Sequence, residues 1–132
     1  MPSVSPPLKG RTILDCSTLL PGPRIGKLLA QKGARVLKIE SPSKPDRAKT
    51  LGPFYDDLNS GKEIIQLEFG KGSVGSYAEG RTRFEKLVRE ADGLIEGFRP
   101  ETKAKLGLDA ATLHAINPKL CIVSLVGYPE DD

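Results

Sequence analysis

Three glycines spaced like a phosphate-binding turn are the first residues of this sequence whose types and spacing suggest chemistry. Gly70, Gly72 and Gly75 follow an apolar run and precede a helix-like one, and Glu96 lies about twenty residues further on. In a dinucleotide-binding protein such glycines let the backbone approach a pyrophosphate, and the acid binds a ribose hydroxyl. The pattern raises the hypothesis of a nicotinamide-cofactor domain, with an ordinary glycine-rich loop as the alternative.

Thiols and imidazoles offer little further chemistry. Cys16 and Cys121 both fall inside apolar, strand-like runs, so we expect two buried, reduced thiols, with a disulfide as the unsupported alternative. No metal site is predicted, because the sequence lacks a set of His, Cys, Asp and Glu residues at ligand spacing. His114, the single histidine, lies in a helix-like stretch where we expect a surface position rather than a catalytic role.

The composition is that of an ordinary globular domain. With 132 residues, 38% of them hydrophobic and 28% charged, the chain is large enough for a single core. No apolar run approaches the roughly 18 residues that span a bilayer, and residues 1–10 lack an apolar signal core. We therefore expect a flexible leader over residues 1–10, a domain over residues 11–132, a cytoplasmic location and no membrane partner.

The net charge of +3 conceals an asymmetry along the chain. Residues 1–50 carry ten Lys or Arg against three acids, whereas residues 51–132 carry ten against fourteen. A positive N-terminal part suits a phosphate-rich small molecule or nucleic acid, with a solvated surface as the plainer alternative. Aromatic residues make up only 5%, and no basic run is interleaved with them, so nucleic acid is not expected as a partner.

The elements that must position these residues alternate between strand and helix. The pattern predicts an α/β fold: an open, mainly parallel, Rossmann-like sheet of about five strands with helices on both faces. Strands are expected at residues 11–17, 34–40, 63–69, 93–97 and 121–126. The first two, with the helix between them, form a βαβ unit with a right-handed crossover. The last run is nearly all apolar, so we expect it in the centre of the sheet.

Helix boundaries can be predicted from single residues. Pro23 suits a first helical turn, and Gly33 can close that helix in a left-handed conformation. A helix over residues 82–92, after the glycine stretch, presents Phe84 and Val88 on one face together with Leu87 and Ala91. Asp109 is a suitable N-cap for a short helix that Pro118 stops.

Four motifs, taken together and in order, resemble a known family. They are LLPGP at 19–23, NSGK at 59–62, EGFRP at 96–100 and LHAINPKL at 113–120. The chain from Leu8 to Tyr128 resembles the opening of the family III CoA-transferases, the CaiB/BaiF group, which includes formyl-CoA transferases and alpha-methylacyl-CoA racemases. The matched stretch corresponds to about the first third of a typical member, whose fold is a Rossmann-like domain that binds CoA.

The resemblance implies a CoA site assembled at strand ends. By similarity, the turn 19–21 lines the CoA channel, the strand end 96–99 approaches the nucleotide and pantetheine, Leu67 flanks the adenine, and Lys105 replaces a usual arginine near the phosphates. A guanidinium and an ammonium are suitable phosphate partners. The implied CoA-binding residues are Leu19, Leu20, Pro21, Leu67, Glu96, Gly97, Phe98, Arg99 and Lys105.

Each implied role has a plainer alternative. Arg99 and Lys105 could be solvated helix charges, and Leu20, Leu67 and Phe98 could be core residues. The glycine pattern is interpreted as a loop extension, because relatives have a shorter connection here. A fingerprint turn should also open a helix at once, whereas the expected helix begins only after a further glycine at position 80.

The family's catalytic residues, an aspartate in the transferases and a His–Asp pair in the racemases, have no counterpart in the matched segment. We therefore expect no catalytic residue and no activity from this chain alone, and we expect it to be a truncated or fragmentary member that forms a homo-oligomer or joins a complementary chain. The sequence leaves three hypotheses in order: a CoA-binding portion of such an enzyme, a stand-alone module for CoA thioesters or a partner, and a dinucleotide-binding domain. The acyl group, and the choice between transfer and epimerisation, stay open.

Overall fold

The computed structural model describes residues 4–70 and 76–126, and it confirms the parallel α/β architecture. The strands are β1 (Thr12–Asp15), β2 (Arg35–Glu40), β3 (Glu63–Gln66), β4 (Gly93–Glu96) and β5 (Cys121–Ser124). They form one sheet in the order β3-β2-β1-β4-β5, and every neighbouring pair is parallel. The order reverses between β1 and β4, which is where open α/β sheets place their ligand sites.

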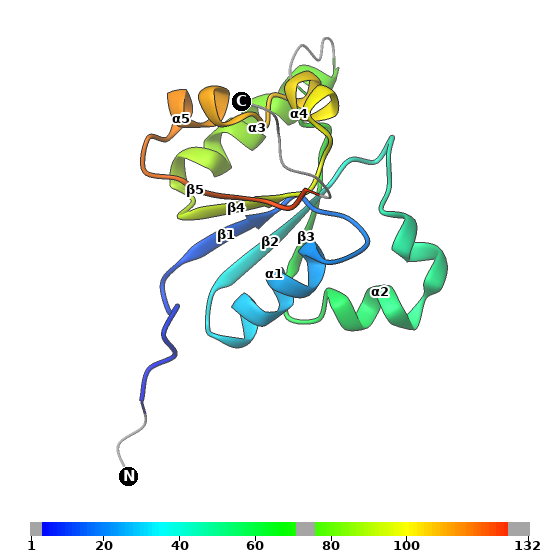
Figure 1. The fold of residues 1–132 in the computed structure, drawn as a ribbon, viewed down its shortest axis with the longest axis vertical. Helices are drawn as coiled ribbons and strands as arrows, with labels where there is room; N and C mark the ends of the chain where they lie inside the picture. Colours follow the sequence, from blue (N-terminus) through cyan, green and yellow to red (C-terminus); the bar gives the residue numbers. More distant parts are fainter. Residues whose placement is uncertain (1–3, 71–75, 127–132) are drawn as a thin grey trace.

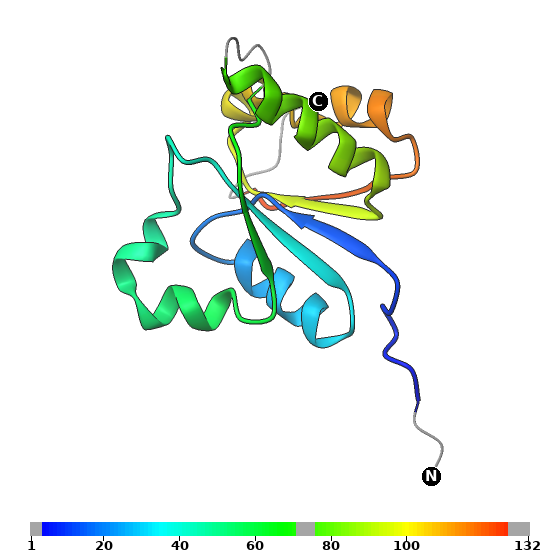
Figure 2. The same ribbon diagram turned by 180° about the vertical axis from the view of Figure 1, so that it is seen from behind.

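The helices divide into two layers, one on each face of the sheet (Figure 1). One layer holds α1 (Gly22–Gln31), the short 3₁₀ helix η1 (Arg47–Leu51) and α2 (Pro53–Leu58). The other holds α3 (Ser76–Glu90), α4 (Pro100–Leu106) and α5 (Ala110–Ile116). Figure 2 shows α3 in the foreground, on the opposite side of the strands from α1. This division follows from right-handed crossovers, which change face when the strand order reverses.

The apolar core lies between the sheet and the layer of α3, α4 and α5. Phe84 and Val88 are fully buried on α3, as the helical periodicity predicted, and Phe84 stacks against Phe69 with a centroid distance of 5.0 Å. Leu37 and Ile39 of β2 join the same cluster. Because side chains alternate along a strand, Lys38 and Glu40 point toward the layer of α1 and α2.

Several helix ends match the sequence expectations. Pro23 lies in the first turn of α1, and Gly33 follows its end with φ of 100°. The Asp109 carboxylate caps α5 by accepting a hydrogen bond of 3.1 Å from Thr112 N–H. The segment before β1 also has a tertiary contact, because Leu8 N–H donates to the Lys32 carbonyl at 2.9 Å.

Two expectations about β5 are wrong. The strand lies at an edge of the sheet and pairs only with β4, whereas the apolar run predicted a central position. Cys121 is exposed, although both thiols were expected to be buried, and Val123 is 38% exposed. Strand order places β5 at the edge. On the face that α1 covers, this helix packs on β1, β2 and β4, so within the described residues Cys121 and Val123 of β5 stay exposed.

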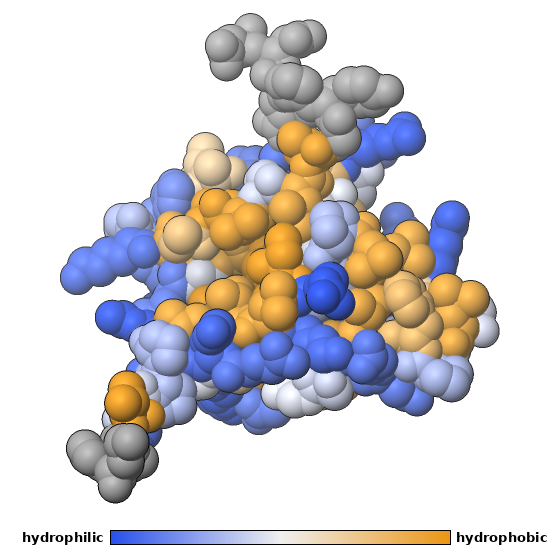
Figure 3. Space-filling view, turned by 60° about the horizontal axis from the view of Figure 1, so that its bottom comes forward, coloured by the Kyte–Doolittle hydropathy of each residue, from blue (hydrophilic) through white to orange (hydrophobic). Residues whose placement is uncertain are grey.

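Apolar side chains gather on one face of the molecule, which is seen when the bottom of the view in Figure 1 is turned forward (Figure 3). Within residues 4–70 and 76–126, the large apolar side chains with substantial exposure are Val4, Leu19, Leu20, Leu28, Leu51, Phe54, Ile64, Val123 and Val126. An apolar surface of this kind commonly marks an interaction site.

Candidate CoA site at the carboxyl ends of the strands

Buried polar contacts hold the loop after β1. Ser17 N–H donates to the Asp15 carboxylate at 3.0 Å, and the Ser17 hydroxyl donates to the same oxygen. Leu19 adopts a φ of 59°, a left-handed conformation that is uncommon outside glycine. A Cβ at Gly22 would lie only 2.2 Å from Ser17 Oγ, so the start of α1 can pack on this loop only with glycine at that position.

The loop after β4 is organised by Glu96. Its carboxylate is fully buried, accepts hydrogen bonds from Ser124 Oγ at 2.5 Å and Phe98 N–H at 3.1 Å, and lies 3.5 Å from Lys103 Nζ. These contacts join β4, β5 and α4 and fix the backbone of Gly97 and Phe98. Glu96 therefore shapes the site indirectly, by holding the backbone of Gly97 and Phe98 in place.

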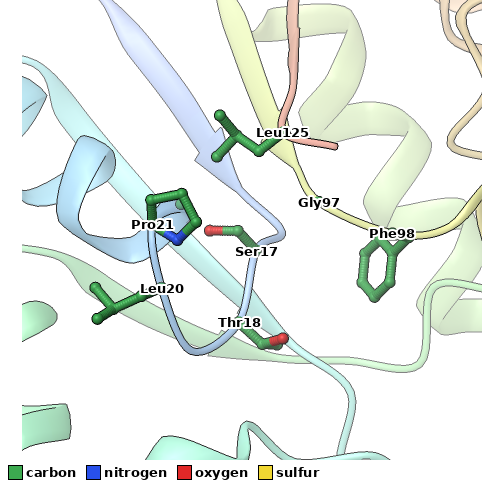
Figure 4. A pocket seen from close by; sticks show the side chains of 8 residues that line it. Ser17, Thr18, Leu20, Pro21, Gly97, Phe98 and Leu125 are labelled. Atoms are coloured by element: carbon green, nitrogen blue, oxygen red, sulfur yellow. The ribbon is translucent and has the colours of Figure 1, made fainter. Parts of the chain in front are cut away.

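These two loops and the end of β5 enclose a small cavity of about 60 Å³, which we call the β1–β4 pocket. In Figure 4 the side chains of Ser17, Pro21 and Leu125 lie close together, while Phe98 stands beyond Gly97. Residues that are far apart in the sequence thus meet at one point. Its lining consists of Ser17, Thr18, Leu20, Pro21, Gly22, Gly97, Phe98 and Leu125.

A second cavity of about 150 Å³, the β2–β3 pocket, adjoins the first. Thr18 and Phe98 line both. Apolar walls come from Ile39, Phe69 and Leu106, and polar groups from the ends of β2 and β3. Its lining consists of Cys16, Thr18, Ile39, Glu40, Ser41, Ser43, Lys44, Glu68, Phe69, Gly70, Phe98, Thr102 and Leu106.

Carboxylates give the β2–β3 pocket its polar character. Glu68 accepts hydrogen bonds from Ser41 Oγ at 2.5 Å and from Ser43 N–H at 2.7 Å. Burial acts to raise the pKa of Glu68, but these hydrogen bonds outweigh it, and the pKa lies below its ordinary value. Glu40 is buried, accepts from the Tyr55 hydroxyl and lies 2.6 Å from Lys49 Nζ. The cavity therefore suits a neutral group that can donate hydrogen bonds better than it suits a phosphate.

The Cys16 thiol lines this pocket, and we expect it to be unreactive. Cys16 is buried, and burial raises the pKa of its thiol far above the ordinary value, with the Asp15 carboxylate adding to the effect. Because the thiolate is the nucleophile, such a group does not take part in chemistry at neutral pH.

The predicted site residues do not all lie at the cavities. Leu20, Pro21, Gly97 and Phe98 line the β1–β4 pocket, and Leu19 is exposed on the same loop. Leu67 is buried in the apolar core, and Glu96 lies beneath the loop that it holds. Arg99 and Lys105 are exposed and line neither cavity.

Sequence reasoning missed the serines and the acid at the ends of β2 and β3. Ser41, Ser43 and Glu68 directly follow strands whose carboxyl ends meet at this edge. That position was the available signal, because polar residues just beyond parallel strands face the ligand edge. Arg81 was also missed: it donates to the carbonyls of Phe69 and Leu106 at 2.8 and 2.9 Å, and it thereby ties the loop after β3 to α4.

The glycine pattern has no cofactor geometry in the part of the chain that the structure describes. Gly72 and Gly75 lie outside those residues. The pattern follows β3, an edge strand, and Glu96 ends β4, which is not a neighbour of β3. The expectation that the helix starts after position 80 is wrong, since α3 begins at Ser76. Gly80 lies within this helix. A larger residue would not fit there, because a Cβ at position 80 would be 2.0 Å from the Glu68 carbonyl oxygen.

Residues 4–70 and 76–126 have neither a candidate metal cluster nor a candidate membrane-spanning helix. They contain no cluster of three or more His, Cys, Asp or Glu residues able to hold a metal ion. They also contain no helix with the length and apolar character needed to cross a bilayer.

Comparison with known proteins identifies the family. The sequence model of the family described as CoA-transferase family III matches residues 8–132. The chain belongs to this family. The CaiB/BaiF resemblance of its motifs is thereby confirmed. A CAIB/BAIF family protein from Brucella suis matches 98% of the chain with a TM-score of 0.84 and 33% identity, and the chain covers 35% of that structure.

Several curated relatives of the chain are named as CoA-transferases. A succinate–glutarate CoA-transferase from Agrobacterium fabrum is 35% identical over 97% of the chain and 34% of its own length. An acetyl-CoA:oxalate CoA-transferase from Acetobacter aceti is 36% identical over 92% of the chain and 32% of its own length. The chain thus spans about a third of the length of the curated relatives that it matches.

Proposed function

We propose that this chain is the N-terminal, CoA-binding portion of a family III CoA-transferase and that it holds CoA or an acyl-CoA thioester across the two adjoining pockets. The observation that carries the proposal is the convergence of the turn 20–21 and the strand end 97–98, which the motifs implicated separately, on one pocket. Family membership supplies the ligand class, since the matching relatives are named for CoA substrates.

The chemistry of the surfaces suggests how CoA lies. The β2–β3 pocket combines apolar walls with two carboxylates, so an uncharged, hydrogen-bond-donating part of CoA fits it, and the phosphates stay outside. Phe98, which faces both pockets, offers an apolar wall to the chain that passes between them. Lys44 lines the β2–β3 pocket, Arg99 precedes the first residue of α4, and Lys105 lies within that helix; these three side chains supply cations for the phosphates.

The acyl group and the covalent step are assigned to no residue here. That the chain contributes binding and not catalysis stays a prediction, as does its association with a second copy or a complementary chain, which the exposed apolar side chains support.

Calorimetric titration and thermal unfolding with CoA, acetyl-CoA and NAD test the proposal. We expect CoA and acetyl-CoA to raise Tm, by the equivalent of about 2.7 kcal/mol when the ligand is at 100 times its Kd, and NAD to have no effect. Phe98→Ala should weaken CoA binding by more than about 1 kcal/mol, because it removes the wall that both pockets share.

A matched pair of double variants tests the phosphate contacts. Arg99→Gln with Lys105→Gln should weaken CoA binding most at low salt, where charges are least screened. Arg83→Gln with Lys86→Gln makes the same change of charge on exposed positions of α3 that line neither pocket, and should leave binding unchanged. Stabilisation by NAD in the absence of any response to CoA would replace this proposal with the dinucleotide-binding hypothesis.

A further inference from the structure

A buried ion pair behind the pocket holds the loop after β1 from the opposite side. Lys38 on β2 is fully buried, and its Nζ donates to the Ser17 carbonyl at 2.5 Å and to Asp46 Oδ2 at 3.0 Å. Asp46, 2% exposed, lies between β2 and η1, and its Oδ1 accepts from Leu19 N–H at 3.1 Å and Ala48 N–H at 2.9 Å. The pair therefore holds the loop at residue 17 and again at residue 19.

The loop needs such support, because its backbone is strained. Leu19 has a φ of 59°, a conformation that a non-glycine residue keeps only when the surrounding structure compensates for its strain. The hydrogen bond from Leu19 N–H to Asp46 is one contact that stabilises this conformation. Leu20 and Pro21, which follow at once, line the β1–β4 pocket together with Ser17 and Thr18.

Stability alone does not account for the pair. Removing two charges from water costs several kcal/mol, and well-packed apolar residues of similar volume often serve a fold equally well or better. We infer that Lys38 and Asp46, neither of which lines a pocket, are positioning residues that set the conformation of the loop 17–21 and, through it, the affinity of the β1–β4 pocket for a CoA thioester. This inference rests on the proposed function for its ligand.

A double variant separates positioning from stability. Lys38→Met with Asp46→Leu leaves no charge buried without a partner. It does remove the partners of the Ser17 carbonyl and of the Leu19 and Ala48 N–H groups, so the free energy of unfolding should fall to some extent while the loop loses its anchors, and binding is compared on the folded protein. We expect the Kd for CoA to rise on the order of tenfold, since small displacements of binding groups are expensive. Amide exchange of Leu19 should accelerate, because its N–H has lost its acceptor.

The same strand provides the control. Arg35→Met with Glu63→Leu makes the same kind of change in an exposed pair, 2.6 Å apart, at the other end of β2 and β3. Both the Kd for CoA and the Leu19 exchange rate should match the parent chain. If the Lys38 and Asp46 double variant is folded and binds CoA as tightly as this control, the positioning role is wrong.

Two outcomes remain to be distinguished. If the parent chain binds no CoA, the proposed function fails, and unchanged Leu19 exchange in the double variant would then overturn the loop inference independently. If the double variant does not fold, Lys38→Met with Asp46→Asn keeps an acceptor for Leu19 N–H and loses the contacts of Lys38 to the Ser17 carbonyl and to residue 46. A rise in Kd of about threefold, part of the full effect, is expected there, and an unchanged Kd would overturn the inference.

Discussion

Gly26→Ala tests whether a glycine on α1 exists to make room for a buried ion pair. Gly26 faces the Asp15–Lys62 pair, whose charged atoms lie 2.7 Å apart and whose side chains are both fully buried. A Cβ at position 26 would lie 2.6 Å from Asp15 Oδ2 and 3.0 Å from Lys62 Nζ. Lys62 Nζ also donates to the Pro23 carbonyl at 2.7 Å and to Asn59 Oδ1 at 2.9 Å, so it has little freedom to move aside.

The magnitude follows from two opposing terms. A normal carbon contact requires the carboxylate oxygen to move by roughly 1 Å, which stretches the pair. Breaking a buried pair outright costs about 3–5 kcal/mol, and a displaced pair loses part of that. Alanine gains about 1 kcal/mol over glycine in a helix. The net loss is about 2 kcal/mol, which lowers Tm by roughly 5–10 °C in a chain of this size.

Urea unfolding followed by circular dichroism measures this loss. Gln31→Ala, an exposed position on the same helix, is the control and should change the free energy of unfolding by no more than about 0.5 kcal/mol. A Gly26→Ala chain that is more stable than the parent by about 1 kcal/mol would show helix propensity acting alone. That result would refute the close approach of α1 to the Asp15–Lys62 pair.

Two further predictions concern titratable groups. In the native chain a thiol reagent should modify the exposed Cys121 within minutes and leave Cys16 unmodified, because burial raises the pKa of the Cys16 thiol; modification of Cys121→Ser protein at a similar rate would contradict this. Burial acts to raise the pKa of Asp46, but hydrogen bonds from Ala48 N–H and Lys38 outweigh it and leave the pKa below the ordinary value. A lowered pKa contributes stability that is present above the unfolded pKa, about 3.9, and is lost as pH falls through the folded value. The difference in free energy of unfolding between the parent chain and Asp46→Asn should therefore shrink as the pH falls below about 4, and a difference that stays constant down to pH 2 would argue against the shift.

The sequence by itself determined the class of fold and the family. Strand-like runs alternating with helical ones require parallel pairing, and the local signals at Pro23, Gly33 and Asp109 act within a few residues of the ends that they define. The four ordered motifs carried the family, and with it the expectation of CoA. Such features can be read from the chain because each depends on near neighbours or on residue identity.

Only the tertiary structure decided which residues meet. An apolar run such as β5 indicates burial but not what covers it, so the edge position of β5 and the exposure of Cys121 could not be foreseen. The same holds for the anchoring of Leu19 by Asp46 and Lys38, and for the meeting of Ser41 with Glu68. These contacts join segments that are distant in the sequence. Their partners are set by strand order and by the handed crossovers that choose a face, and neither leaves a local pattern.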